Sequence, residues 1–257
     1  MGGINKEKFT ASLDSRHTVM FAHIFDMAEA AVKRGCSTYG DFLSENSIST
    51  LMIREGFLPA KPVLFGGTED AERQMVAFID EYDEVDFPIG AVRIVSPMLK
   101  NLSHRDFLGS ILGLGIKREK CGDIIILDGE CYVILHRDIA SFVASELTKV
   151  GRVGVKCTEC DLSDIQLPEK SFTPVSGTVA SLRLDAVVSL FTGKGRSRAA
   201  ELISAGFVFV NGISCEKNDM HLADGDTISV RGHGKAIIEV GGKSKKDRIF
   251  VTVKKYS

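Results

Sequence analysis

The sequence predicts an α+β fold made of a small, mostly helical N-terminal domain, a ferredoxin-like (split βαβ) middle domain and a C-terminal domain of two helices plus a β-hairpin sheet. Three observations lead to this prediction. Apolar residues recur at helical spacing between positions 20 and 31. Apolar runs between positions 91 and 158 follow the order β-α-β-β-α-β. Two short amphipathic helices at positions 182–206 are followed by a β-branched run and an Asn-Gly turn.

Changes in composition mark the boundaries between these parts. The run EYDEVD at residues 81–86 is an acidic connector, and residues 161–177 are rich in Ser, Pro and acidic residues, as linkers are. Clustered carboxylates can also bind a divalent cation, but this run lacks the ligand spacing of a known cation loop. We therefore expect an N-terminal domain at 1–80, a middle domain at 87–160, a linker at 161–180 and a C-terminal domain at 181–257.

In the N-terminal domain we expect one long helix that ends at Gly35. Its apolar face consists of Met20, Ile24, Met27, Ala28 and Ala31. Shorter helices are expected at 39–43 and 50–55, and strands at 61–65 and 75–79. The sequence GGTEDAER lacks the Lys-Ser/Thr pair with which a phosphate loop holds phosphate and magnesium, so it predicts a plain turn.

In the middle domain we expect strands at 91–96, 124–127, 132–135 and 152–157, with a helix in each half of the pattern. RNA-recognition modules with this strand order stack bases on aromatic residues of the central strands, and here Tyr132 is the single aromatic. A basic surface is the alternative RNA-binding face, although a solvated loop explains it equally well. That surface consists of His104, Arg105, Lys117, Arg118 and Lys120.

In the C-terminal domain, three cations crowd the loop that opens the second helix, namely Lys194, Arg196 and Arg198. A helix start presents unpaired N–H groups and a partial positive charge, so added cations make it a site for phosphate oxygens. Arg183 lies one helix earlier and can reach the same side. Single surface cations are usually only solvated, but this cluster at a helix entry favours RNA contact.

The residues of this region, R-L-D and then G-x-G-R-S-x-A-A-E-L-I-x-x-G-x-V-x-V-N-G, resemble the S4-type RNA-binding domain. The resemblance implies that Asp185 orients the loop arginines. It also implies an RNA-facing surface on or beside Arg183, Lys194, Arg196, Ser197, Arg198 and Asn211. Further positive charge on the RNA-binding side is expected at Lys217, Arg231, Lys235 and the loop 241–246.

Two longer stretches, LSHRDFLGSILGLGIKREKCGDI and ELTKVGRVGV, are similar to the middle domain of the YlmH family of bacterial S4 proteins. GGTEDAER resembles the N-terminal region of that family, so the resemblance spans nearly the whole chain. It implies an RNA-binding protein of translation or ribosome quality control. The implied partners are ribosomal RNA, tRNA and the large ribosomal subunit carrying an obstructed peptidyl-tRNA.

One departure from the family is the segment Cys157-Thr158-Glu159-Cys160. C-x-x-C can be half of a zinc site, but a structural zinc needs four ligands and the other four cysteines are single. A redox pair would open a helix, whereas this one is expected to end a strand. We therefore expect two incidental thiols, no metal site and no cofactor.

Charge is unevenly distributed along the 257 residues, whose net charge is −2. Residues 181–257 contain 13 Lys and Arg against 8 Asp and Glu, a net of +5, while residues 1–180 contain 19 against 26, a net of −7. This split suggests that nucleic acid meets the C-terminal part first. Because the sequence lacks both a run of 18 apolar residues and an apolar signal segment at its start, we expect a cytoplasmic protein without membrane contact. We also expect a monomer.

The alternative function is that of an RNA-modifying enzyme anchored by the C-terminal domain. Pseudouridine synthases carry an S4 domain and an R-L-D motif with a catalytic aspartate, and Arg183-Leu184-Asp185 matches those letters. The adjoining GKGRSRAAELI assigns them to the binding module instead, and no second R-L-D precedes them. We therefore expect a non-catalytic binder.

Overall fold

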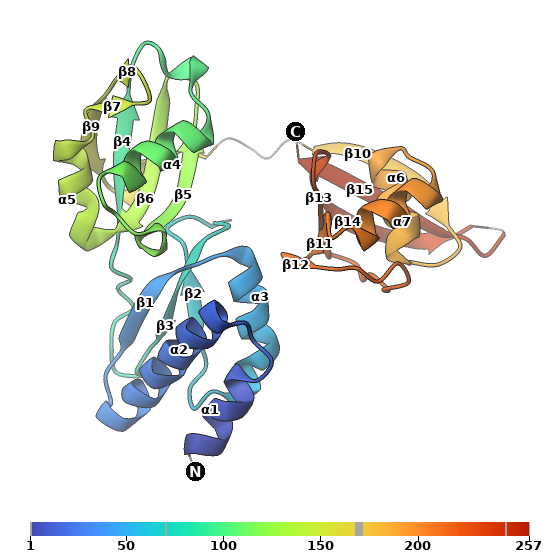
Figure 1. Cartoon of the computed structure of the whole chain (residues 1–257), viewed down its shortest axis with the longest axis horizontal. Helices are drawn as coiled ribbons and strands as arrows, with labels where there is room; N and C mark the ends of the chain where they lie inside the picture. Colours follow the sequence, from blue (N-terminus) through green and yellow to red (C-terminus); the bar gives the residue numbers. More distant parts are fainter. Residues whose placement is uncertain (1, 70, 168–171, 245, 257) are drawn as a thin grey trace. The chain divides into compact units, whose positions relative to one another are not determined.

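The computed structural model describes residues 2–69, 71–167, 172–244 and 246–256, with the side chains of residues 2–4 left out (Figure 1). Part of the predicted linker, one residue of GGTEDAER and Lys245 of the basic loop lie outside the described residues. Chain contacts divide the protein into two compact units, Met1–Pro168 and Glu169–Ser257. In the described parts of both units, every helix is too short or too polar to span a bilayer.

The first part of unit 1 has helices α1 (Gly2–Thr10), α2 (Ser15–Arg34) and α3 (Glu45–Arg54), the 3-10 turn η1 (Glu55–Phe57) and strands β1 (Thr38–Leu43), β2 (Val63–Phe65) and β3 (Gln74–Phe78). The strands form an antiparallel sheet in the order β1-β3-β2. Helix α2 begins where the Asp14 carboxylate accepts the N–H groups of Arg16 and His17, and it ends at Gly35, with φ of 60°.

The helix expected at 39–43 is wrong, because this segment is strand β1 and pairs with β3. Adjacent side chains on a strand point to opposite faces. Here both faces are covered, since Leu43 packs into the core of α1, α2 and α3, while Phe42 packs into a second core. A strand buried on both faces loses the polar alternation by which a sequence reveals it.

The second part of unit 1 confirms the ferredoxin-like sandwich. Its main elements follow the predicted order and form one antiparallel sheet, β5-β6-β4-β9. They are β4 (Ile89–Val95), α4 (His104–Gly113), β5 (Cys121–Ile126), β6 (Glu130–His136), α5 (Arg137–Glu146) and β9 (Lys156–Cys160), with the 3-10 turns η2 (Leu99–Asn101), η3 (Arg118–Lys120) and η4 (Leu162–Asp164). A small hairpin of β7 (Lys149–Val150) and β8 (Val153–Gly154) occupies the start of the predicted last strand, so that strand begins later, at Lys156.

The two parts of unit 1 share a core and a polar junction. Phe42 and Met75 of the first sheet pack with Ile89 and Ile134 of the second. Arg73 donates its Nε–H to the Cys121 carbonyl at 2.9 Å and an Nη2–H to the Phe42 carbonyl at 3.0 Å. Both parts therefore belong to one compact unit.

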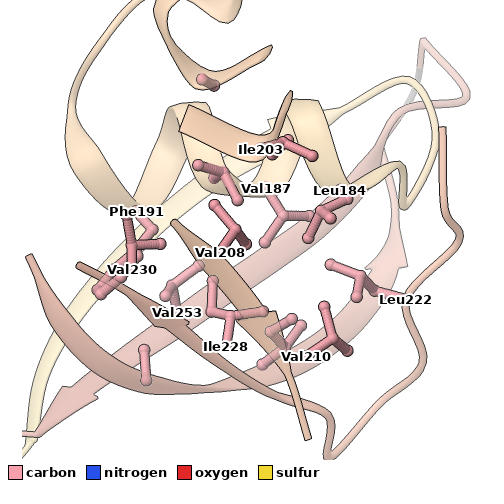
Figure 2. Packing of buried hydrophobic residues seen from close by; sticks show 14 of the residues in the cluster. Leu184, Val187, Phe191, Ile203, Val208, Val210, Leu222, Ile228, Val230 and Val253 are labelled. Atoms are coloured by element: carbon pink, nitrogen blue, oxygen red, sulfur yellow. The ribbon is translucent and has the colours of Figure 1, made fainter. Parts of the chain in front are cut away.

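Unit 2 is a six-stranded sheet with two helices on one face (Figure 1). The strand order is β10-β15-β14-β13-β11-β12. Figure 2 shows the apolar core between the helices and the sheet, with Leu184 and Val187 of α6 near Val208 of β11. The elements are β10 (Phe172–Val179), α6 (Leu184–Thr192), α7 (Arg196–Ser204), β11 (Val208–Val210), β12 (Ile213–Ser214), β13 (Thr227–Val230), β14 (Gly234–Lys243) and β15 (Ile249–Tyr256).

Strand β10 lies within the stretch expected to be a linker. All eight of its residues pair with β15, from Phe172 opposite Tyr256 to Val179 opposite Ile249. In the described part of that stretch, residues 172–179 therefore belong to the sheet of unit 2. The polar sequence FTPVSGTV fits an edge strand, which has one sheet neighbour and a largely solvated surface.

Candidate nucleic-acid interface

The predicted cationic loop forms the mouth of helix α7. Helix α6 ends at Gly193, whose φ of 65° is left-handed, and α7 starts two residues after Lys194. The Ser189 hydroxyl donates to the Lys194 carbonyl at 2.7 Å, which fixes the loop against α6. The residues from Gly193 to Arg198 are all exposed. The α7 entry, with its cations, is thus open to solvent within unit 2.

Asp185 holds together two arginines at this mouth, Arg183 from the N-cap of α6 and Arg196 from the start of α7. Arg183 donates Nε–H and Nη2–H to the two Asp185 oxygens, each at 3.2 Å, and Arg196 donates Nη2–H to Oδ2 at 2.7 Å. The Asp185 side chain is only 11% exposed, whereas those of Arg183 and Arg196 are 38% and 59% exposed. Asp185 therefore orients both guanidinium groups, while both arginine side chains remain partly accessible to solvent.

The electrostatics of this triad favour the charged states of Asp185 and Arg183. Burial alone would raise the pKa of Asp185, but hydrogen bonds from Arg183 and Arg196 outweigh burial, so the pKa lies below its ordinary value. The hydrogen bond to Asp185 raises the pKa of Arg183. Two cations and one anion leave a net positive charge at the surface.

Two further predicted residues lie along the first turn of α7. Ser197 is exposed, and Arg198 forms an ion pair of 2.5 Å with Glu201, one turn along the helix. Their side chains are 63% and 62% exposed, and a pair so exposed contributes little to stability and separates easily. Arg198 therefore remains accessible to a stronger anion such as phosphate.

Asn211 serves the fold at its predicted hairpin. Asn211 and Gly212 have φ of 49° and 78° and join β11 to β12, which confirms the two-residue turn. The Asn211 amide donates to Asp226 at 2.9 Å and accepts the N–H of Thr227 at 2.9 Å. The side chain thereby ties the turn to the start of β13.

The three remaining predicted cations of unit 2 belong to its strands and their connections. Arg231 follows β13, and its guanidinium lies 5.0 Å from the centre of the Phe207 ring. Lys235 lies on β14 opposite Ser229, and Lys217 is exposed after β12. The stacked Arg231 keeps its N–H groups available at the ring edge, a geometry suited to a phosphate or a base.

The predicted basic surface of unit 1 divides into two groups. Arg118 and Lys120 hold the protein together, because Arg118 donates to the Cys121 carbonyl at 2.7 Å and Lys120 pairs with Asp41 at 2.6 Å. Burial lowers the pKa of Arg118. The other three residues are exposed. His104 and Arg105 lie at the start of α4, and Lys117 lies before η3.

Arg248 is a further exposed cation beside the candidate interface, and sequence reasoning missed it. It precedes β15 and donates Nε–H to the Thr178 hydroxyl at 3.1 Å and Nη2–H to the Thr178 carbonyl at 2.6 Å. Arg248 and Arg196 line the same pocket of about 270 Å³. The basic loop before β15 indicates positive charge in this region. However, Thr178, the hydrogen-bond partner of Arg248, is 70 positions away in the sequence.

The C-x-x-C segment lies inside strand β9. Residues three apart on a strand point to opposite faces, so Cys157 and Cys160 cannot converge on one ion. Burial raises the pKa of Cys157 to about 11. Among the residues that the structure describes, no three His, Cys, Asp or Glu side chains are grouped as metal ligands would be.

Comparison with known proteins matches both units. The family model "Putative RNA-binding domain in YlmH" matches residues 83–164, and the S4 domain model matches residues 182–228. Ribosome-associated protein quality control protein P2 of Bacillus subtilis (strain 168) is 34% identical over 217 residues, which cover 82% of this chain and 84% of that protein. The solved structure of cell division protein ylmH from Streptococcus pneumoniae is 16% identical, with a TM-score of 0.47, and covers 59% of this chain and 95% of that chain.

The family follows from the length of the match with the Bacillus subtilis protein and from the two models. The identity extends over most of both chains, and the models match the sandwich and the module that carries Asp185. The chain therefore belongs to the YlmH family of S4-domain RNA-binding proteins.

Proposed function

We propose that this protein is a non-catalytic binder of ribosomal RNA and tRNA that acts on the large ribosomal subunit. Its role is in ribosome quality control, on subunits that carry an obstructed peptidyl-tRNA, and it acts as a cytoplasmic monomer. The observation that carries the proposal is the pair of guanidinium groups, half-buried in Arg183 and exposed in Arg196, that Asp185 orients at the α7 mouth. The name of the Bacillus subtilis relative supports the ribosomal context.

The geometry at the α7 mouth suits phosphate rather than a neutral ligand. Guanidinium groups form paired hydrogen bonds with phosphate oxygens, and groups already oriented lose less conformational entropy on binding. The N–H groups of the first turn of α7 add partial positive charge, because the Gly195 cap has no side chain to satisfy them. Folded RNA, with its dense phosphates, matches this arrangement.

Unit 1 supplies a second, weaker contact in this proposal. His104 and Arg105 are exposed at the start of α4, and Lys117 is exposed between the end of that helix and η3. We assign Arg118 and Lys120 to the fold in this proposal, because both make contacts inside unit 1. The RNA surface of unit 1 is therefore smaller than its sequence suggests.

The role of Asp185 argues against the enzymatic alternative. A catalytic aspartate must reach its substrate, yet both carboxylate oxygens of Asp185 accept hydrogen bonds from arginines and its side chain is nearly buried. A carboxylate whose two oxygens both accept hydrogen bonds from arginines serves to position those arginines. Detectable pseudouridine formation in ribosomal RNA that is lost in Asp185→Asn would contradict the proposal.

Co-sedimentation with purified large subunits, with and without tRNA, tests the proposed function. Binding should weaken steeply between about 50 and 300 mM salt, since each neutralised phosphate releases counterions. Replacing Arg196 and Arg198 together by Ala should reduce binding by at least tenfold. Lys254→Ala is the matched control, because Lys254 pairs with Glu239 and alternates along β15 with Val253, which faces the core. Binding indifferent to salt and to both arginines would refute RNA recognition.

A further inference from the structure

A pocket of about 270 Å³ lies where helix α6 meets strand β10 in unit 2. Its wall is apolar at Ala186 and Leu190 and polar at Ser189, and two arginines, Arg196 and Arg248, complete it. No Asp or Glu is among the described residues that line it. Two cations without a lining carboxylate make this pocket attractive to an anion.

Both arginines are held in place by the protein itself. Asp185 accepts from Arg196 at 2.7 Å, and Thr178 accepts twice from Arg248, at 2.6 and 3.1 Å. The two bonds to Thr178 use two of the five N–H donors of a guanidinium, so donors remain for a ligand. Arg248 is also fixed through its backbone, since its N–H donates to the Ser244 hydroxyl at 3.1 Å.

Pairing of distant strands creates this site. Thr178 lies on β10 opposite Phe250 of β15, and Arg248, the residue before β15, lines the pocket together with Ala186, Ser189 and Leu190 of α6. Gly177 permits the close packing, because a Cβ atom there would lie 2.7 Å from a methyl carbon of Leu190. The S4 model matches residues 182–228, so Thr178 and Arg248 are additions from outside the matched module.

We propose that Arg248 and Arg196 bind one phosphodiester group of the RNA in this pocket, with the attached ribose against Ala186 and Leu190. This extends the RNA-binding surface from the α7 mouth to the edge strand β10. The inference rests on the proposed function, because it assumes that RNA occupies the α7 mouth.

The test measures binding of the full chain to purified large-subunit ribosomal RNA by fluorescence anisotropy over a range of salt concentrations. Arg248→Gln should weaken binding about three- to tenfold and reduce the slope of log affinity against log salt by about one counterion. Thr178→Val keeps the charge of Arg248 but removes one of its anchors, so it should weaken binding about two- to threefold. Lys254→Gln, with the same charge change on the outward face of β15, should bind like the unaltered protein.

Each outcome separates this inference from the proposed function. If the unaltered protein binds with the expected salt dependence and Arg248→Gln equals Lys254→Gln, the pocket assignment is overturned while RNA binding stands. Absence of salt-sensitive binding by the unaltered protein overturns both. If inorganic phosphate displaces RNA more than chloride at equal ionic strength, and only when Arg248 is present, phosphate and RNA compete for this pocket and the assignment is supported. Melting curves of all variants confirm that each is folded.

Discussion

Asp185 links the stability of unit 2 to its surface charge. Replacing it by Asn keeps the shape but removes the anion between Arg183 and Arg196. We expect Asp185→Asn to lower the free energy of unfolding by about 1–3 kcal/mol, because a nearly buried charge-assisted network is broken. RNA affinity should fall about three- to tenfold, since both guanidinium groups lose their orientation. Urea denaturation and anisotropy measure the two effects.

Glu201→Gln is the matched control for stability. It makes the same carboxylate-to-amide change in the same unit, but the pair of Glu201 with Arg198 is exposed. Its effect on the free energy of unfolding should stay below about 0.5 kcal/mol. Equal effects of the two substitutions would mean that Asp185 does not act as an anchor.

The depressed pKa of Asp185 makes its contribution depend on pH. A carboxyl whose pKa is lower in the folded state stabilises fully above its unfolded-state pKa, about 3.9, and this stabilisation is lost as pH falls through the folded pKa. The difference in unfolding free energy between the unaltered protein and Asp185→Asn should therefore be constant near pH 7 and shrink below about pH 4. A difference that grows on acidification would contradict this assignment.

The thiols of the C-x-x-C segment should be inert. Burial raises the pKa of Cys157 to about 11 and also raises that of Cys160, so both remain protonated near neutral pH. We expect the melting temperature to be unchanged by a metal chelator. Zinc found in stoichiometric amount by elemental analysis would overturn this prediction.

Whether the partner of a residue can be predicted depends on how far apart the two residues lie in the sequence. Arg183, Asp185 and Arg196 fall within one short motif, and its resemblance to S4 domains implied that the aspartate orients the arginines. Arg248 meets Thr178 through a strand pairing that no local pattern encodes. Likewise, nothing in the sequence around Lys120 indicates that its ion-pair partner is Asp41, which lies on a strand of the other sheet.

Among the elements, the hairpin between β11 and β12 depends on its first turn residue. Asn211→Ala would lose hydrogen bonds to Asp226 and Thr227 and would place Ala at a φ of 49°. We expect a loss of about 1–2 kcal/mol in the free energy of unfolding. Asn211→Gly relieves only the backbone strain, so it should recover part of the loss. If Asn211→Ala weakens RNA binding with no loss of stability, its role is direct contact instead.

Elements with local signals were predictable, and those with remote partners were not. The βαββαβ order and the Asn-Gly turn are written in consecutive residues, and the structure confirms both. Strand β1 was mistaken for a helix because its partner, β3, lies more than thirty residues later and its register shifts between Tyr39 and Phe42. Strand β10 has too little apolar alternation to stand out from a linker.

For the whole molecule, Arg73 ties the two halves of unit 1 together. Burial, followed by the nearby charge of Arg118, lowers the pKa of Arg73 to about 10, and carbonyl groups of Phe42 and Cys121 offset the lost hydration. We expect Arg73→Met to reduce the stability of unit 1 by about 2 kcal/mol, because buried carbonyls lose their donor. Calorimetry should show the lower melting temperature in the transition of unit 1 alone.

Arg93→Met provides the comparison for this experiment. Arg93 also pairs across strands in unit 1, with Glu130 at 2.6 Å, but half of its side chain is exposed. Its replacement should shift the melting temperature much less. A similar shift for both variants would show that the Arg73 junction has no special role in the unit.

Strand β10 comes before the other strands of unit 2 in the sequence, and its partner β15 comes after them. The sheet can therefore be completed only after β15 has been synthesised. A nascent chain that has emerged only as far as residue 248 already contains both helices and the hairpin, yet β10 still has no neighbour. The pocket of Arg248 therefore forms only after β15 has been synthesised. A messenger truncated before the codons of β15 would yield a protein that keeps its S4 motif but lacks the strand pairing that holds Arg248 against Thr178.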